Sequence, residues 1–273
     1  MSPDAPPVAV DVAVVNWNTS PAALAAATAY QASVGVEARV TIVDNDSRPE
    51  QQRLLRDGCP DGVRLRLNSE NLGYGRAANG ALSDGQAEFV CVSNADVLPE
   101  PEALGALAAA ARGPRKGMVG PVFGDDADRY HAALPGAVTM LARIFVGSFG
   151  ERRQPEPSAG AVAEIEQPSG ACFVARRDTW EEAGGFDEGF FLWYEDVDLA
   201  KRLHSAGRRN LVVGSARVGH TRAEAFAQVD RRRQQAIRLR SVERYIRLHH
   251  GWTAPMAAPL LSLSRRLRAG GAR

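Results

Sequence analysis

Short runs rich in Val and Ile alternate with segments of helical composition over the first 122 residues, and this alternation limits the fold more than any other feature of the sequence. The apolar runs lie at residues 8–15, 38–43, 63–67, 89–92 and 118–122, and the helical segments lie at 21–31, 50–57, 76–82 and 102–111. Such alternation predicts an α/β fold in which a mostly parallel, Rossmann-like central sheet is flanked by helices. Ligands of these sheets bind at the carboxyl ends of the strands, so a functional site is expected there.

The composition is that of an ordinary globular protein. Its 273 residues carry a formal net charge of +1, which gives no reason to expect a nucleic-acid partner. The three cysteines are widely spaced and form no CxxC pair, as expected of reduced intracellular thiols. The first apolar run follows no basic region and contains Asp11, and no run of about 18 apolar residues exists, so neither a signal peptide nor a membrane span is predicted. We expect a cytoplasmic protein, with contact to the inner face of the membrane left open.

Polar residues follow each of the first four predicted strands. They occupy residues 16–18, 44–47, 68–73 and 93–96. Turn chemistry alone favours Asn, Asp and Ser at any one such position. Four polar strand ends on the same edge of a sheet nevertheless predict a ligand site.

A carboxylate cluster follows an apolar run in the second half of the chain. Glu195, Asp196 and Asp198 stand at the start of a predicted helix, directly after the apolar residues 190–194. The helix dipole favours carboxylates in a first turn, and this accounts for one or two of them. The apolar residues would also keep a carboxylate in a partly dry pocket, which is the environment of a general base.

Residues 73–78 match the dinucleotide-binding pattern G-x-G-x-x-A, and Asp96 lies about 20 residues further on. The glycines, however, belong to the third strand–helix unit, and four residues separate them from their strand. An NAD-dependent oxidoreductase would also leave the carboxylate cluster without a role. This class of enzyme is the alternative interpretation.

Seven ordered motifs point to one family. They are VVNWN at 14–18, VDNDS at 43–47, NLGYGRAAN at 71–79, SNADVLP at 93–99, SGACFVARR at 169–177, GGFDEGFFLWYEDVDLAKRL at 184–203, and His220. With them the chain resembles glycosyltransferase family 2, the inverting GT-A enzymes, and in particular bacterial rhamnosyltransferases that act on lipid-linked sugars. The resemblance implies a GT-A domain at 1–222, with a nucleotide-sugar half at 1–122 and an acceptor half at 123–222, followed by a basic helical extension at 223–273.

The resemblance implies a nucleotide-sugar donor across the strand ends. The nucleotide would be UDP or dTDP, and the sugar rhamnose or an N-acetylhexosamine. Asn16 and Asp44 would flank the nucleoside, with Asp44 bonded to the imide edge of the base. Asn71, Gly73 and Gly75 would form the loop against the nucleotide, where glycine lets the backbone approach closely.

A divalent cation is implied by the same family. Residues 94–96, Asn-Ala-Asp, occupy the place of its D-x-D motif, which holds Mg²⁺ or Mn²⁺ against the donor diphosphate. Asp96 would be the main ligand, Asn94 a weaker one and His220 a third. Because Asn94 replaces the first carboxylate, a catalytically silent carbohydrate-binding protein with this fold is a further alternative.

The catalytic base implied by the resemblance is Asp196. It would deprotonate the acceptor hydroxyl as that oxygen attacks the anomeric carbon from the face opposite the diphosphate, which inverts the anomeric centre. Glu195 would orient the site or bind the acceptor, a saccharide or a polyprenyl-linked saccharide. Residues 123–167, rich in Gly, Pro, Asp and Arg, are interpreted as an insertion on the acceptor side.

A basic helix is predicted at residues 229–250. Between residues 229 and 273 there are eleven Arg residues against only Asp230 and Glu243, and the helix has an apolar side. Three interpretations stay open. The helix can lie on an anionic membrane surface, pack on the domain, or form the contact of a homodimer.

Overall fold

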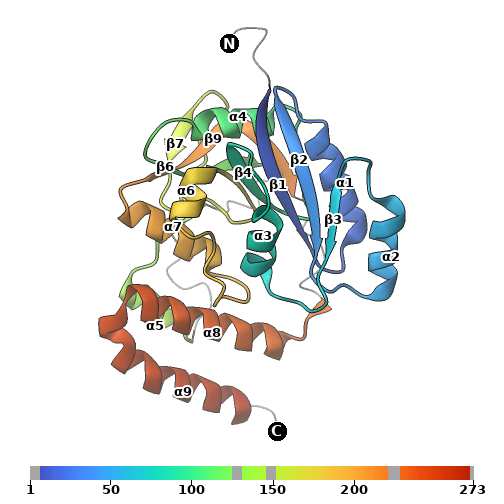
Figure 1. The fold of residues 1–273 in the computed structure, drawn as a ribbon. Coiled ribbons are helices and arrows are strands. Elements are labelled where there is room, and N and C mark those ends of the chain that lie inside the picture. Colours follow the sequence, from blue (N-terminus) through green and yellow to red (C-terminus); the bar gives the residue numbers. More distant parts are fainter. Residues whose placement is uncertain (1–6, 125–130, 146–151, 221–227, 271–273) are drawn as a thin grey trace.

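The computed structural model describes residues 7–124, 131–145, 152–220 and 228–270, and its centre is one β-sheet (Figure 1). Within the described residues the sheet has nine strands in the order β3-β2-β1-β4-β8-β6-β9-β5, with β7 paired to β9. The strands are β1 Val8–Asn16, β2 Val36–Asp44, β3 Arg64–Leu67, β4 Phe89–Asn94, β5 Val97–Pro99, β6 Lys116–Phe123, β7 Val162–Glu164, β8 Cys172–Arg176 and β9 Arg209–His220. Helices flank it, which confirms the α/β class.

The first half of the sheet is parallel, as predicted. Strand β1 pairs in parallel with β2 and β4, and β2 pairs in parallel with β3. The register sets Asn16 beside Asp44, and Val15 beside Asn94. The polar strand ends seen in the sequence therefore meet at one edge.

The second half of the described sheet is mixed, so the predicted parallel arrangement holds for β3, β2, β1 and β4 and for the pair of β6 and β9. Strand β8 runs antiparallel between β4 and β6, while β9 is parallel to β6. The short strands β5 and β7 pair antiparallel with β9. Strand β5 carries little sequence signal, because it has three residues and ends at Pro99, which has no N–H for a ladder.

Helices cover both faces of the sheet. Helices α1 (Ser20–Gln31) and α4 (Ala103–Ala111) pack on one face, with α2 (Pro49–Gly58) beside α1. Helices α3 (Tyr74–Leu82), α6 (Arg177–Glu182) and α7 (Glu195–Ser205) cover the other face. Successive residues of β1 serve the two layers in turn, since Val12 and Val14 belong to one core and Ala13 and Val15 to the other.

A third core joins the C-terminal helices to the domain. Helices α5 (Ala137–Arg143), α8 (Arg231–His249) and α9 (Ala254–Gly270), with the 3₁₀ turn η2 (Gly251–Thr253), enclose a cluster that includes Tyr194, Val242 and Leu261. Figure 1 shows α8 below the sheet and α9 as the outermost layer. Helices α8 and α9 account for most of the described part of residues 223–273. The apolar side of α8 packs on the domain, because Tyr245 and Ile246 are buried.

No helix among the described residues is long and apolar enough to cross a membrane. Of the predicted insertion at 123–167, residues 125–130 and 146–151 lie outside the described part of the chain. Its described remainder supplies α5 and β7. Met140 of α5 is buried in the third core, so this part of the insertion is packed on the domain.

Candidate active site

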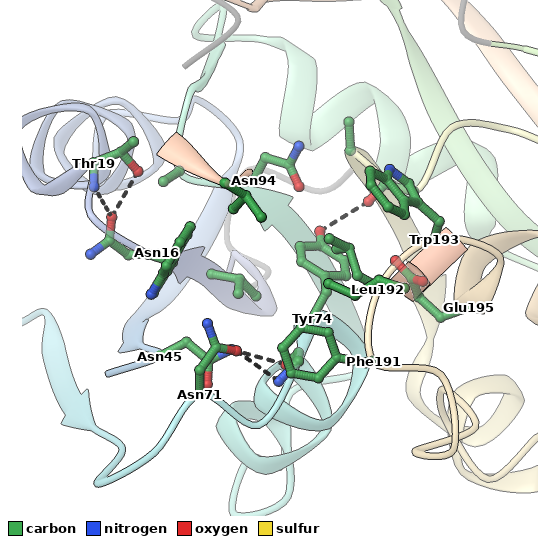
Figure 2. A pocket seen from close by; sticks show the side chains of 18 of the residues that line it. Asn16, Thr19, Asn45, Asn71, Tyr74, Asn94, Phe191, Leu192, Trp193 and Glu195 are labelled. Atoms are coloured by element: carbon green, nitrogen blue, oxygen red, sulfur yellow. Dashed lines mark hydrogen bonds between the residues drawn. The ribbon is translucent and has the colours of Figure 1, made fainter. Parts of the chain in front are cut away.

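A cavity of about 780 Å³ opens where the carboxyl ends of the parallel strands face α7 and α8. One side, the strand-end wall, contains Asn16, Asn45, Asn71, Asn94, Asp96 and His220. The opposite side, the helical wall, contains Phe191, Leu192, Trp193, Glu195, Asp196, Arg233 and Ile237. Figure 2 shows Asn16, Asn45 and Asn71 across the cavity from Phe191, Trp193 and Glu195.

The cavity lining includes eight of the ten site residues that were predicted from the sequence: Asn16, Asn71, Gly73, Asn94, Asp96, Glu195, Asp196 and His220. Asp44 and Gly75 are not part of it. The fully buried carboxylate of Asp44 accepts hydrogen bonds from Asn16 Nδ2 (2.7 Å) and from the backbone N–H and hydroxyl of Ser47. Asp44 therefore lies behind Asn16, where it fixes the orientation of that amide.

Asparagines connect the ends of β2 and β3. Asn45 donates through Nδ2 to Oδ1 of Asn71 at 3.0 Å and to the carbonyl of Gly73 at 3.1 Å. Its own Oδ1 accepts the backbone N–H of Leu72 at 2.9 Å. Asn45 was not predicted as a site residue, although it stands within the VDNDS motif. A strand-end pattern locates the turn but does not tell which of its residues faces the cavity.

Gly73 is the point where the two walls touch. Its φ angle is +85°, and a Cβ added there would lie 2.3 Å from the carbonyl oxygen of Phe191. That same oxygen accepts the N–H of Tyr74 at 2.9 Å. No side chain other than hydrogen fits. Gly75 has a different role: a Cβ there would lie 2.9 Å from Cβ of Phe186, so this glycine allows α3 to pack against the segment before α7.

Asp96 and His220 meet because of the sheet topology. The turn at residues 94–96 connects β4 to β5, and β5 pairs with β9 so that Val97 faces His220. Oδ2 of Asp96 and Nε2 of His220 are 3.2 Å apart, and both side chains are about 10% exposed. Asn94 lines the same cavity. Among the described residues, no group of three or more His, Cys, Asp or Glu side chains could hold a metal ion by itself.

Asp196 is held rigidly in the first turn of α7. Its Oδ2 accepts the backbone N–H of Gly170 at 3.0 Å and Nε2 of Gln167 at 3.3 Å, while Oδ1 accepts the N–H of Val197 at 2.8 Å. A Cβ at Gly170 would lie 2.5 Å from Cβ of Asp196, so the approach requires glycine. Burial raises the pKa of Asp196, against the effect of these donors.

Glu195 faces the cavity without a hydrogen-bond partner for Oε2 among the described residues. Its side chain is only 6% exposed. Burial, and then the charge of neighbouring Asp196, raise the pKa of Glu195 to about 8. The pair therefore combines a Glu that keeps its proton at neutral pH with an Asp whose oxygens receive three N–H donors.

The loop before α7 has a left-handed backbone at two successive residues. Trp193 and Tyr194 have φ angles of 62° and 71°. The neighbouring helices hold this conformation in place, since Ser241 Oγ of α8 donates to the carbonyl of Leu192 at 2.7 Å, and Arg143 of α5 donates to the Tyr194 hydroxyl at 3.2 Å. Non-glycine residues adopt such angles at a cost, and this occurs most often at functional sites.

Helix α8 completes the helical wall. The sequence predicted the helix but not its position over the cavity. Arg233, Gln234 and Ile237 line the cavity together with the residues just before the helix. Asp230 caps α8, because its side chain accepts the N–H groups of Arg232 and Arg233. Arg233 is the one Arg or Lys side chain of the described cavity lining. The sequence marks the start of the helix but not its docking over the strand ends.

Comparison with known proteins assigns the family. Residues 6–238 match the model described as "Glycosyltransferase like family 2". The chain belongs to this family of glycosyltransferases. It is also 33% identical to the N-acetylglucosaminyl-diphospho-decaprenol L-rhamnosyltransferase of Mycobacterium tuberculosis, over 80% of this chain and 78% of that protein. An O-antigen biosynthesis protein of Myxococcus xanthus is 27% identical over 69% of this chain, which corresponds to 16% of that protein.

Solved structures share the fold. The mannosyltransferase PcManGT of Pyrobaculum calidifontis, in complex with GDP-Man and Mn²⁺, matches 98% of this chain and 82% of its own with a TM-score of 0.59 and 20% identity. GalNAc-T7 with UDP, GalNAc and Mn²⁺ matches 80% of this chain with a TM-score of 0.56 and 17% identity. In that comparison, the match spans 44% of the GalNAc-T7 chain. The predicted GT-A architecture is therefore confirmed.

Proposed function

We propose that the chain is an inverting glycosyltransferase that moves a sugar, in the first instance L-rhamnose, from a dTDP- or UDP-sugar to a hydroxyl of a lipid-linked saccharide. The observation that carries the proposal is one cavity with the Asp96 and His220 pair on one wall and a buried carboxyl pair on the other. The choice of sugar and acceptor is supported by the rhamnosyltransferase relative. A UDP-N-acetylhexosamine is the competing donor.

The donor is proposed to lie along the strand-end wall, in the half formed by residues 1–122, and the acceptor on the side of residues 123–222. The amides of Asn16 and Asn45 are committed to hydrogen bonds within the protein and shape this wall, so that of the three amides it is Nδ2 of Asn71 that would donate to a nucleoside. Asp44 acts through Asn16, whose amide it orients. On the helical wall, the rings of Phe191 and Trp193 offer apolar faces to an acceptor sugar.

Asp96, Asn94 and His220 suit a divalent cation that takes its remaining ligands from the donor diphosphate. The set offers a carboxylate oxygen, an amide oxygen and an imidazole nitrogen, which Mn²⁺ accepts and Mg²⁺ accepts in part. The ion would neutralise charge that builds on the departing nucleoside diphosphate. From the opposite wall, Arg233 adds a fixed positive charge for the same group.

Asp196 is proposed as the general base. It takes the proton of the acceptor hydroxyl while that oxygen forms a bond to the anomeric carbon and the bond from this carbon to the diphosphate oxygen breaks. Attack opposite the leaving group inverts the anomeric centre. Glu195, which retains its proton, would donate a hydrogen bond to the acceptor, and Gln167 and Gly170 keep the base oriented.

Transfer to a lipid-linked acceptor takes place at a membrane surface, and we propose that this is the cytoplasmic surface. For the basic helix at residues 229–250, the sequence left three interpretations open: contact with the membrane, packing on the domain, or contact within a homodimer. Because the apolar side of α8 is buried in the domain, a lipid contact would have to come from elsewhere in the helical extension.

The test is a transfer assay with a prenyl-diphosphate-linked N-acetylglucosamine acceptor and dTDP-rhamnose, UDP-N-acetylglucosamine, GDP-mannose or no donor, with and without Mn²⁺. We expect Mn²⁺-dependent transfer from dTDP-rhamnose, and an inverted anomeric configuration in the NMR spectrum of the product. Melting-temperature shifts with the same nucleotides and with NAD run in parallel. A shift with NAD alone would favour the oxidoreductase, and nucleotide binding without transfer from any donor would favour the silent binding protein.

A further inference from the structure

Exposed apolar side chains lie along the 3₁₀ turn η2 and helix α9. Trp252, Met256 and Leu263 are 76%, 57% and 48% exposed. Met256, the exposed Pro259 and Leu263 follow one another at spacings of three and four residues and so share one side of α9, and Trp252 directly precedes this helix in the 3₁₀ turn η2. We call these four residues the α9 stripe. Exposed apolar side chains grouped in this way mark interaction sites on soluble proteins.

The other side of α9 packs on the domain in its described part, up to Ser264. Ala257 and Leu261 are buried in the third core, and Ser264 Oγ donates to the carbonyl of Ile144 at 3.1 Å. The helix is therefore fixed by contacts to α8 and to the end of α5. The α9 stripe remains exposed. Helix α9 itself forms the outermost layer of the molecule (Figure 1).

Charge decides which partner fits the stripe. From residue 251 to 273 the sequence has four Arg and no Asp or Glu. Exposed Arg232 and Arg240 of α8 add to this positive charge. A second copy with the same excess of Arg in this part of its sequence would be repelled, whereas an anionic lipid surface attracts such a segment by about 1 kcal/mol for each cation close to the surface. Trp is also the side chain that prefers the boundary between lipid and water.

We propose that the α9 stripe docks on the surface of an anionic lipid bilayer, with Trp252, Met256 and Leu263 inserted at the level of the headgroups. The helix lies on the membrane rather than across it, since its length and polarity do not suit a span. Helix α8, which lines the cavity, then lies between that cavity and the bilayer. This inference goes beyond the proposed transfer reaction, because lipid binding is measured without any sugar substrate.

The experiment is co-sedimentation of the full chain with phosphatidylcholine vesicles that contain 30% phosphatidylglycerol (roughly a typical anionic content) or none. The test variant combines Trp252→Ser, Met256→Ser and Leu263→Ser. Its control, Val34→Ser with Leu54→Ser and Val162→Ser, changes three exposed apolar residues outside the C-terminal helices. Melting temperatures of both variants confirm that they are folded.

We expect the wild type and the control variant to bind the anionic vesicles and the stripe variant to bind at least about tenfold more weakly, as loss of three inserted side chains implies. Raised salt should weaken binding by the wild type. Equal binding by the stripe variant, or no vesicle binding by the wild type, would overturn the proposal. So would a wild-type dimer in sedimentation velocity that the stripe variant alone abolishes, because a second copy would then cover the stripe.

Discussion

The two walls of the cavity are built in different ways. The strand-end wall consists of polar residues at the ends of adjacent strands, and hydrogen bonds among Asn16, Asn45 and their neighbours fix it. The helical wall consists of a left-handed loop, a buried carboxyl pair and a helix from the far end of the sequence. Regular structure alone places the first wall, whereas the second depends on tertiary contacts to α5 and α8.

This difference suggests a division of labour that mutations can test. If the strand-end wall binds the donor and the helical wall does the proton chemistry, changes in the first should affect nucleotide and metal binding. Changes in the second should affect turnover. Residues that join the walls should affect the stability of the whole site.

The largest effect is expected from Asp196→Asn. Loss of the base should lower kcat by about 10³-fold and leave nucleotide affinity within about twofold, because general-base catalysis contributes on the order of 10²–10⁴. Transfer kinetics and nucleotide titrations measure the two quantities. Asp84→Asn, at an exposed position beyond α3, is the control and should match the wild type. A loss of nucleotide affinity in Asp196→Asn as large as the loss in kcat would show that the two walls do not have separate roles.

The second effect concerns the strand-end wall. Asp96→Asn should remove the Mn²⁺-dependent part of the nucleotide-induced melting shift and lower transfer by about 10²-fold, since one charged ligand is lost. Asn94→Asp should act in the opposite direction and tighten Mn²⁺ binding several-fold, roughly as an added carboxylate ligand does. Titration of Mn²⁺ at fixed nucleotide checks both. Metal binding that is indifferent to both changes would show that the cation lies elsewhere.

The third effect tests the junction of the walls. Gly73→Ala should lower the free energy of unfolding by about 3 kcal/mol, because it adds a clash with the Phe191 carbonyl to an unfavourable backbone angle. Gly113→Ala is the matched control, since its φ is +91° and nothing lies within 4 Å of the added Cβ. It should cost about 1 kcal/mol. Urea unfolding measures both, and equal losses would mean that the contact with Phe191 contributes nothing.

The smallest effect is a pH dependence. The pKa of Glu195 is raised from 4.5 to about 8 in the folded chain. Between these values the folded state keeps a proton that the unfolded state has lost, so the wild type loses stability as pH rises through this window. Glu195→Gln removes that loss and should be more stable than the wild type by roughly 2 kcal/mol at pH 8.5, with little difference at pH 4.5. Melting curves at pH 4.5 and pH 8.5 measure this, with Glu50→Gln as an exposed control. A stability difference between Glu195→Gln and the wild type that does not grow with pH would contradict the prediction.

The strand-end wall was largely predictable from the sequence. Asn16, Asn94 and Asp96 follow apolar runs, and the alternation of runs with helical segments fixes the edge of the sheet at which they meet. The sequence pattern is less informative one residue away. Asp44 is buried behind Asn16 and Asn45 lines the cavity instead, because the pattern gives the end of a strand but not the direction of each side chain beyond it.

The helical wall was predictable only in part. Glu195 and Asp196 stood out because carboxylates follow an apolar run, whereas Arg233 had no local signal for its place over the cavity. Helix α9 was not predicted as a separate helix, since Pro259 interrupts its pattern. Such features depend on contacts between segments that are far apart in the chain, and a single sequence carries no record of them.

The position of α8 has a consequence for the newly made protein. Synthesis proceeds from the N-terminus, so all strands of the described sheet, which ends at β9, leave the ribosome before α8 does. Until then, Leu192 lacks the hydroxyl of Ser241 that holds its carbonyl, and the cavity lacks Arg233. A nascent chain therefore folds its sheet without forming the complete cavity, whose helical wall is finished only after α8 has left the ribosome.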